Sequence, residues 1–532
     1  MARITHWPAD LWQRSVEHPR LTAVVLGLLS ASGFEPLGLW PLALAAMGAF
    51  VALIATTRDA KSAVVLGWLF GVAHFTFSNN WIAEAFTHQA EMPAILGWAA
   101  VPLLSLYLAV YPAVAALGAR AIAGLAGPPL LGWPLALAFA GCWTVSELLR
   151  SQVFTGYAWN PFAMVLLGPF DRPGLAALAP WTGTYALSGI AVLAAAALAL
   201  LVLERRWVPA ALVAALLAAG MYLPASAARE GTLRVTLVQP NLAQAQINDP
   251  AHFAGNFRTL ADLTVPREPG ASRLVLWPES GLSDYLRPGY PARFYLSRTA
   301  FGDPDLARQR IGRIIGPGSL LLTGAVDLEF DGETVTGAYN AVTAIDAEGD
   351  IRGGYAKAHL VPYGEYLPMR SLLEPIGLSR LVPGAIDFIP GPGPRTLDLG
   401  ALGKAGIQIC YEIVFSGEVV DRSARPDYIF NPSNDGWFGP FGPPQHLAQA
   451  RMRAIEEGLP VLRATTTGIS AVIDARGVVR DHLPTDEAGR IDGLVPPALP
   501  PTVFARLGNL LAFGWAILFL ALAVVALRQS PR

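Results

Sequence analysis

The apolar residues of this chain are gathered into two separate parts of the sequence. Long apolar runs fill residues 21 to 223 and return at residues 510 to 527, whereas residues 230 to 500 have the composition of a soluble domain. Only 15% of all residues are charged, against about 25% in soluble proteins. We therefore expect a membrane domain over residues 1–228, a polar domain over 229–500, and a terminal membrane helix with a short tail over 501–532.

The apolar runs predict eight membrane-spanning helices. A spanning helix needs about 20 residues, and the first three runs are shorter than that. We expect no cleavable signal sequence, because the first run begins only at Leu21 and further apolar segments follow it. The expected spans are Leu21–Gly33, Pro41–Ala55, Ala63–Phe77, Met92–Leu117, Leu131–Leu149, Trp181–Leu203, Trp207–Leu223 and Leu510–Leu527.

The basic residues predict the orientation of these spans. Eight spans place both termini on one side of the membrane. The short loops on the opposite side carry few basic residues, chiefly Arg150 and Arg172. Because basic loops stay in the cytoplasm, we expect cytoplasmic termini and a polar domain outside the cytoplasm. The basic residues on the side of the termini are Arg14, Arg20, Arg58, Lys61, Arg120, Arg205, Arg206 and Arg528.

Two charged residues, Glu147 and Arg150, lie at the outer end of the fifth expected span. Charges near the membrane are rare and need a partner. Either the two residues form an interfacial ion pair or they contribute to a site for a lipid headgroup, and the sequence leaves both possibilities open.

Several classes of function are not expected. The net charge of −2 argues against a nucleic-acid partner. The sequence contains no cluster with metal-ligand spacing and no phosphate-binding glycine loop, so we expect neither a metal nor an organic cofactor.

The two cysteines, Cys142 and Cys410, lie in an apolar run and in the polar domain respectively, so a disulfide between them is not expected. We expect a monomer.

The polar domain alternates strand-like runs with turns and helices, which is typical of one layered α/β domain. A helix is expected over Gln445–Gly458, closed by its glycine. Hairpin turns are expected at Asp346–Asp350 and Asp474–Gly477. The expected strands are Leu233–Gln239, Arg273–Leu276, Ser319–Ala325, Asn340–Asp346, Ala405–Cys410, Asp427–Asn431, Leu459–Ala464 and Ser470–Asp474.

Three reactive side chains follow strand-like runs: Glu279, Lys357 and Cys410. The thiolate is the nucleophilic form of cysteine, whose free pKa is about 8.5. Glu279 is a candidate base for the thiol proton. Lys357 is a candidate partner for the thiolate or for an oxyanion, together with the backbone amide after Cys410. Taken singly, each residue favours a role outside catalysis: Glu279 as a helix cap, Lys357 as a surface residue and Cys410 as a core residue. Together they favour thiol-based acyl transfer.

The residues around these side chains resemble the signatures of a known family. Trp277-Pro-Glu279, Tyr355-Ala-Lys357 and Cys410-Tyr-Glu412 are similar to the Glu-Lys-Cys motifs of the nitrilase, or carbon–nitrogen hydrolase, superfamily. With the membrane segments included, essentially the whole chain resembles the apolipoprotein N-acyltransferases of bacterial envelopes. The strings that carry this narrower resemblance are Phe34-Glu-Pro-Leu-Gly-Leu-Trp40, Phe154-Thr-Gly-Tyr-Ala-Trp-Asn160, Lys357-Ala-His-Leu-Val-Pro-Tyr-Gly-Glu365-Tyr-Leu-Pro, Asn431-Pro-Ser-Asn434-Asp-Gly-Trp-Phe-Gly439 and Gln445-His446-Leu-Ala-Gln-Ala-Arg451.

The resemblance implies a fold and a set of site residues. It implies an αββα nitrilase-like sandwich on the periplasmic side of a bacterial inner membrane, with Glu279 as base, Lys357 as oxyanion stabiliser and Cys410 as nucleophile. One departure is visible: the family often carries a tryptophan near the site where this chain has Ile247-Asn248. The supporting residues that the resemblance implies are Asn340, Glu365, Tyr411 and Glu412.

The resemblance also implies a reaction in two steps. Cys410 takes an acyl chain from a phospholipid, typically the sn-1 chain of phosphatidylethanolamine, as a thioester. The α-amine of the N-terminal diacylglyceryl-cysteine of an apolipoprotein then accepts the acyl chain. The alternative is a membrane-tethered amidase of the nitrilase type that hydrolyses small soluble amides. The apolar loops Leu381–Pro390 and Phe438–Pro444 are candidate lids at the membrane surface.

Overall fold

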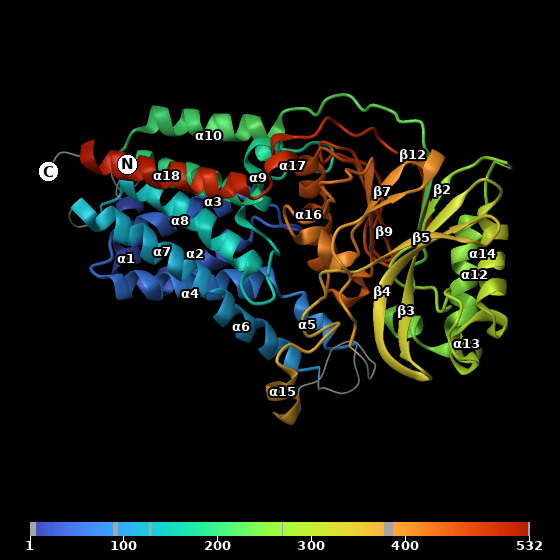
Figure 1. The fold of residues 1–532 in the computed structure, drawn as a ribbon. Helices are drawn as coiled ribbons and strands as arrows, with labels where there is room; N and C mark the ends of the chain where they lie inside the picture. The colour runs from blue at the N-terminus through green and yellow to red at the C-terminus, as the bar shows by residue number, and fades with distance from the viewer. Residues whose placement is uncertain (1–6, 89–93, 127–129, 269, 377–386, 530–532) are drawn as a thin grey trace.

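The computed structural model describes residues 7–88, 94–126, 130–268, 270–376 and 387–529. A bundle of apolar helices forms one end of the molecule, and two β-sheets with their covering helices form the other (Figure 1). The N- and C-termini lie at the far end of the bundle, away from the sheets. Most of the candidate loop Leu381–Pro390 lies outside the described residues.

Helix covers most of each of the eight apolar segments. Residues 32, 33, 94, 95, 109, 131, 132 and 223 are not helical, and residues 92 and 93 lie outside the described part. By length and composition, four helical stretches in the described part can cross a membrane: Ala60–Ser78, Leu96–Ala123, Leu175–Leu203 and Leu510–Gln529. The apolar helices α2, α3 and α10 are shorter. The bundle and its connections contain α1 (Trp7–Glu17), α2 (Pro19–Ala31), α3 (Trp40–Ala55), α4 (Ala60–Ser78), α5 (Ile82–Ala85), α6 (Leu96–Leu108), α7 (Val110–Ala123), α8 (Trp133–Gln152), α9 (Ala179–Leu203), α10 (Trp207–Tyr222), α17 (Val503–Leu507) and α18 (Leu510–Gln529).

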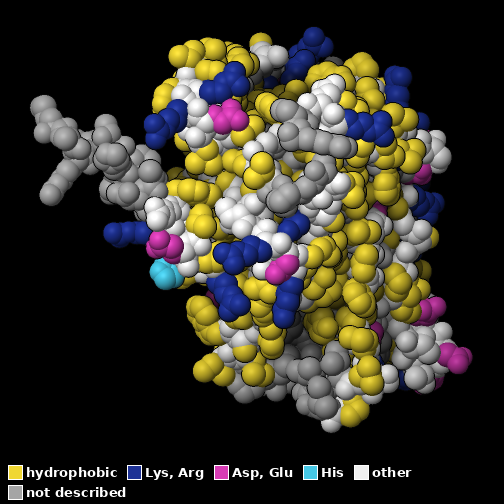
Figure 2. Space-filling view, turned by 90° about the vertical axis from the view of Figure 1, so that its left-hand side faces the viewer, with side chains coloured by type: hydrophobic (Ala, Val, Ile, Leu, Met, Phe, Trp, Pro, Cys, Tyr) yellow, Lys and Arg dark blue, Asp and Glu magenta, His cyan; other side chains and the backbone are white. Residues whose placement is uncertain are grey.

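Small residues let the helices of the bundle pack closely, as in membrane proteins generally. A Cβ atom at Gly48 of α3 would lie 2.3 Å from the carbonyl oxygen of Ala195 in α9. The end of the bundle that carries the termini is largely hydrophobic, with Lys and Arg side chains gathered on it (Figure 2). At this end Arg120 donates a hydrogen bond to the carbonyl of Arg58, so two of the basic loops adjoin.

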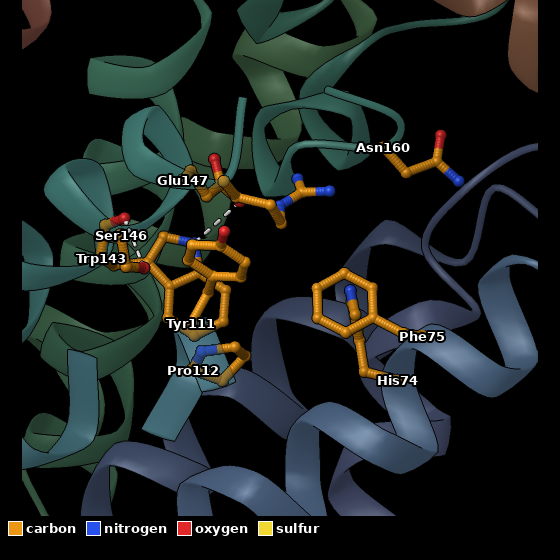
Figure 3. Close-up of a pocket in the computed structure, with 9 residues that line it drawn as sticks. His74, Phe75, Tyr111, Pro112, Trp143, Ser146, Glu147 and Asn160 are labelled. Atoms are coloured by element: carbon orange, nitrogen blue, oxygen red, sulfur yellow. Dashed lines mark hydrogen bonds between the residues drawn. The ribbon is translucent and has the colours of Figure 1, made fainter. Parts of the chain in front are cut away.

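Glu147 and Arg150 do not form the ion pair that was one of the two expectations. Glu147 Oε1 accepts hydrogen bonds from the Phe162 amide (2.7 Å) and the Trp143 indole (3.0 Å), and Arg150 donates to the Trp159 carbonyl (2.7 Å). Both residues line a small cavity, with Trp143 and Glu147 on one side and His74 and Phe75 on the other (Figure 3). Its volume of about 10 Å³ suits at most one water molecule. Both charges therefore hold the backbone of the loop after α8.

The described residues of the polar domain form two six-stranded sheets, in the orders β12-β1-β2-β3-β4-β5 and β11-β10-β9-β8-β7-β6. Strands β1, β2 and β3 are parallel, as are β7, β8 and β9. The strands are β1 (Arg234–Gln239), β2 (Leu274–Leu276), β3 (Leu320–Asp331), β4 (Thr334–Asp346), β5 (Ile351–Ala356), β6 (Thr396–Asp398), β7 (Lys404–Ile407), β8 (Tyr428–Ser433), β9 (Val461–Thr465), β10 (Ser470–Ile473), β11 (Val479–Leu483) and β12 (Gly489–Leu494).

The two sheets are stacked between layers of helices, which gives the expected α/β sandwich. Leu237 and Leu276 of one sheet share a hydrophobic core with Ile407 and Phe430 of the other. Helices α12 and α14 cover the outer face of the first sheet, and α16 covers the second (Figure 1). The helices of this domain are α11 (Gln244–Ile247), α12 (Phe253–Thr264), α13 (Ala292–Arg298), α14 (Pro304–Ile315), α15 (Arg370–Leu373) and α16 (Gly442–Glu457).

Helix α16 joins the sandwich to the bundle. Leu447 and Ala450 pack into the core on the outer face of the second sheet, whereas Met452 and Ile455 belong to the hydrophobic core of the bundle. Every residue of this helix is buried except Pro444, which is partly exposed. Its closing residue, Gly458, adopts the left-handed conformation, as expected for a glycine at this position. The predicted helix at 445–458 is thus confirmed.

Candidate active site

Glu279, Lys357 and Cys410 lie on loops that follow strands of both sheets. Glu279 comes after β2 and Lys357 directly after β5, both in the first sheet. Cys410 comes after β7 in the second sheet. Because the two sheets are stacked, these loops meet at one edge of the sandwich.

The Lys357 ammonium lies between two carboxylates. Its Nζ atom is 2.9 Å from Glu365 Oε2 and 3.6 Å from Glu279 Oε1. The amide of Asn340 donates to the same two carboxylates, at 2.7 Å to Glu279 and 2.8 Å to Glu365. The lysine side chain is only 1% exposed. The structure thus brings together Glu279, Asn340, Lys357 and Glu365.

Cys410 lies in a tight turn. The prediction that it ends a strand, Ala405–Cys410, is wrong. Strand β7 stops at Ile407, and Cys410 begins a 3₁₀ turn, Cys410–Val414. Its φ angle of 51° is in the left-handed region, which costs a non-glycine residue about 1–2 kcal/mol. Strain of this kind is concentrated at functional sites. The thiol is buried and in hydrogen-bonding contact with Glu279.

Glu412 connects the loop of the nucleophile to the loop of the lysine. Its Oε2 atom accepts a hydrogen bond from the Ile409 amide at 2.8 Å. Its Oε1 atom accepts from the Tyr355 hydroxyl at 2.7 Å and from the Ala358 amide at 2.8 Å. One carboxylate therefore fixes the distance between the two loops. Burial raises the pKa of Glu412 to about 7.

Tyr411 faces the bundle and not the Glu279–Lys357 pair. Its ring stacks with Trp159 of the loop after α8, with ring centres 6.4 Å apart, and contacts His359 and Phe415 edge-on. Among the described residues, no acceptor bonds the Tyr411 backbone amide. That amide is a free donor beside the nucleophile.

The charges around Cys410 determine its protonation. Burial raises the pKa of the Cys410 thiol well above its ordinary value, and Glu279 adds to this effect while Lys357 opposes it. Burial also raises the pKa of Glu279, against the pull of Lys357. Burial alone would lower the pKa of Lys357, but Glu365 and Glu279 outweigh it and raise that pKa. The resting site therefore holds a protonated thiol, a permanent cation and a carboxylate with an increased proton affinity.

Comparisons with known proteins cover both parts of the chain. The family model of the apolipoprotein N-acyltransferase N-terminal domain matches residues 26–197, and that of carbon-nitrogen hydrolases matches residues 234–498. An apolipoprotein N-acyltransferase of Rhodopseudomonas palustris is 35% identical to this chain, and the alignment covers 98% of this chain and 96% of that protein. The chain belongs to the apolipoprotein N-acyltransferase family.

Other relatives agree with this assignment. An apolipoprotein N-acyltransferase of Bradyrhizobium diazoefficiens is also 35% identical, over 96% of this chain and 95% of that protein. Among solved structures, a carbon-nitrogen hydrolase of Helicobacter pylori covers 49% of this chain and 88% of its own, at 15% identity and a TM-score of 0.35, a likeness too weak to support an argument. Because the matches include the membrane part, they favour an N-acyltransferase over a tethered amidase.

Sequence reasoning about this N-acyltransferase missed two contacts to the reactive residues. The backbone N–H of Asn434 donates a hydrogen bond to Glu279 Oε2 at 2.8 Å and also contacts the Cys410 thiol. The His446 Nε2 atom lies 3.0 Å from the Cys410 carbonyl oxygen. Both residues lie in strings that carry the family resemblance, but contacts made by or to the backbone leave no pattern of side-chain types from which a role could be inferred.

In the segment around Ile247-Asn248, where the family often carries a tryptophan, the residue that lies beside the candidate active site is Gln244. Asn248 Oδ1 accepts a hydrogen bond from Arg298, on the exposed side of the domain. Gln244, four residues earlier, accepts from the Asn434 side chain at 2.9 Å. Gln244 is therefore the residue of this segment that adjoins the site.

Proposed function

We propose that this protein transfers an acyl chain from a phospholipid, through a thioester on Cys410, to the N-terminal amine of diacylglyceryl-cysteine in an apolipoprotein. The observation that carries the proposal is the buried cluster in which the Cys410 thiol contacts Glu279 and Lys357 lies 3.6 Å from the same carboxylate. The family supports an apolipoprotein as the acceptor, since the relatives are named apolipoprotein N-acyltransferases; the phospholipid donor and the thioester are part of the proposal.

In the first step the thiol proton moves to the Glu279 carboxylate, and the sulfur attacks the ester carbonyl of the phospholipid. The resulting oxyanion is stabilised by the Lys357 ammonium and by the free Tyr411 amide. One such donor is typically worth about 3 kcal/mol in the transition state. The intermediate collapses when the C–O bond breaks, and the proton on Glu279 passes to the leaving lysophospholipid oxygen.

In the second step the neutral amine of the acceptor attacks the thioester carbonyl. Glu279 takes a proton from the amine, the C–S bond breaks, and the thiolate leaves beside Lys357 before it is reprotonated. The product is an amide. The site is buried, which favours amine attack over hydrolysis because water is kept from the thioester.

We further propose eight membrane spans with both termini in the cytoplasm and the sandwich in the periplasm, as a monomer. Loops at alternate ends of successive helices support the span count. Glu35, after α2, and Trp81, after α4, contact residues near α16, whereas the loop with Arg58, after α3, lies at the other end. The Lys and Arg side chains at the end that carries the termini (Figure 2) support the orientation. The proposed division is 1–228, 229–500 and 501–532.

The proposed donor is phosphatidylethanolamine, with its sn-1 chain transferred. Purified full-length protein incubated with phosphatidylethanolamine vesicles should gain the mass of one acyl chain on Cys410 in intact-protein and peptide mass spectra. Cys142→Ala is the matched control, because Cys142 lies in α8 beside Gly118 of the bundle, and it should gain the same mass. Cys410→Ala should gain none. An unmodified wild-type protein that releases ammonia from small amides would instead favour the amidase.

A further inference from the structure

A buried histidine holds the carbonyl group of the nucleophile. His446, on α16, is fully buried, and its Nε2 atom lies 3.0 Å from the Cys410 carbonyl oxygen. A carbonyl oxygen only accepts hydrogen bonds, so Nε2 carries the hydrogen. The other ring nitrogen, Nδ1, faces Asp435 Oδ1 at 2.9 Å and Arg463 Nη2 at 3.0 Å.

The partners of His446 are themselves fixed. Arg463 and Asp435 form an ion pair of 2.6 Å, and both side chains are 0% exposed. Arg463 also donates to the Ser433 hydroxyl at 2.9 Å, at the end of β8. The imidazole ring therefore has one orientation, set by residues of β8, β9 and the loop after β8.

The direction of the Cys410 carbonyl sets the direction of the next amide. The Cys410–Tyr411 peptide is trans, since Glu35–Pro36 is the one cis bond in the described part of the chain. In a planar trans peptide the C=O and N–H groups point in opposite directions. When His446 holds the carbonyl, the Tyr411 N–H is turned away from α16. This is the amide for which no described residue is an acceptor.

We propose that His446 is a positioning residue that aims the Tyr411 amide at the oxyanion. It touches no substrate, and it acts by holding the peptide group between Cys410 and Tyr411 in the strained left-handed turn. This inference rests on the proposed acyl transfer, because an oxyanion forms only when the thiol attacks a carbonyl.

Two reactions of the same thiol separate this role from a merely structural one. Acylation by phosphatidylethanolamine passes through an oxyanion, whereas alkylation by iodoacetamide displaces iodide and forms none. His446→Leu in the full-length protein should slow single-turnover acylation of Cys410 by about 10-fold to 100-fold, up to the loss for one missing oxyanion donor, and should leave the alkylation rate within about twofold. The KM for phosphatidylethanolamine should stay unchanged, because the donor acts in the transition state.

His446→Gln should restore most of the acylation rate, because its amide can reach the Cys410 carbonyl, whereas the shorter His446→Asn should not. Gln449→Leu is the matched control. Gln449 is a fully buried polar residue one turn further along α16, and its side chain makes a single hydrogen bond to the described residues, at 3.4 Å to Asn160. In the Gln449→Leu variant, Cys410 should be acylated at the wild-type rate.

Equal losses in acylation and alkylation, or wild-type acylation in His446→Leu, would overturn the role of His446. If His446→Leu fails to fold, the Gln and Asn variants decide: equal acylation rates in these two would overturn it. If the wild-type protein forms no adduct while iodoacetamide still labels Cys410, the proposed acyl transfer fails instead.

Discussion

The Nζ atom of Lys357 lies 2.9 Å from Glu365 in a site where the lysine is 1% exposed and Glu365 is 7% exposed. A buried cation needs such a partner, since removing one member of a buried ion pair typically costs about 3–5 kcal/mol. Glu365 also acts on the proposed base, because its negative charge raises the pKa of Glu279. Glu365 thus influences both the proposed base and the oxyanion stabiliser.

Glu279→Gln should abolish the acid limb of the pH–rate profile. The proposed base works only as a carboxylate, and burial raises its pKa above the ordinary 4.5. Acylation by the wild-type protein should therefore fall as the pH drops, with a midpoint above 4.5. The measurement is the single-turnover rate of thioester formation from pH 4 to 8. A wild-type limb centred at or below 4.5 would contradict the role of Glu279.

Glu365→Gln should move that acid limb to lower pH. The substitution removes a negative charge that raises the pKa of Glu279 and leaves Lys357, which lowers it. The plateau rate should also fall, because Lys357 loses its nearest carboxylate. Glu374→Gln is a suitable control, since within the described part of the chain Glu374 pairs with the exposed Arg370 and with no residue of the site. An unshifted limb in Glu365→Gln would show that the two carboxylates are not coupled.

Lys357→Ala should be nearly as damaging as Cys410→Ala. The ammonium is the only charged donor proposed for the oxyanion, and loss of one donor typically reduces the rate by about a hundredfold or more. Loss of the cation should also raise the pKa of the Cys410 thiol further, because Lys357 lowers it. Both effects are measured on the same samples, by acylation rate and by iodoacetamide labelling against pH. Acylation within tenfold of wild type would exclude Lys357 from the oxyanion site.

Glu412→Gln should flatten the dependence of thermal stability on pH. The pKa of Glu412 is about 7 in the folded protein and 4.5 in an unfolded chain. The folded state therefore binds the proton more tightly, so this residue stabilises the protein below pH 4.5 and loses that contribution as the pH rises to about 7. The apparent Tm in detergent from pH 4.5 to 8 tests this. Parallel curves for wild type and Glu412→Gln would rule out a contribution from this carboxyl.

Arg451→Gln should weaken the attachment of the sandwich to the bundle without changing the chemistry. Arg451 is buried and donates to the carbonyls of Gly477, Gly168, Pro169 and Arg172. Loss of hydrogen bonds to a charged group should cost about 2 kcal/mol or more and lower the apparent Tm. The alkylation rate of Cys410 per folded molecule should stay at the wild-type value. A selective loss of alkylation with an unchanged Tm would instead place Arg451 in the site.

The interior strands could be predicted from the sequence with approximate bounds, whereas the edge strands could not. Of the edge strands, only the run before Lys357, which is the end of β5, was recognised as strand-like. All eight predicted strands exist, although several ends shift, and β3 and β4 extend into polar, partly exposed residues. The strands that the list of predictions lacked, β5, β6, β11 and β12, are the outer strands of the two sheets. Edge strands face solvent and carry polar residues, so they lack the apolar pattern on which prediction depends. Both predicted hairpin turns connect such a strand to its neighbour.

The reactive and charged side chains of the candidate site could be predicted from the sequence, whereas its backbone geometry could not. The structure places Glu279, Asn340, Lys357, Glu365 and Cys410 side by side, and Glu412 joins their loops. The left-handed turn at Cys410 was not predictable, because it depends on contacts from α16 that lie far along the chain. Glu147 and Arg150 illustrate the same limit, since their partners are backbone groups of the following loop.

The burial of α16 has a consequence for how this architecture can change. Helix α16 packs into two hydrophobic cores and therefore has no solvent-exposed face. If the bundle were removed, Met452 and Ile455 would become exposed to water. The Arg453–Glu456 pair of 2.8 Å would also lose its contact with Thr184 of α9. The sandwich is therefore not a soluble enzyme to which a membrane anchor was added. A soluble descendant of this chain would have to rebuild one whole side of its nucleophile-bearing half.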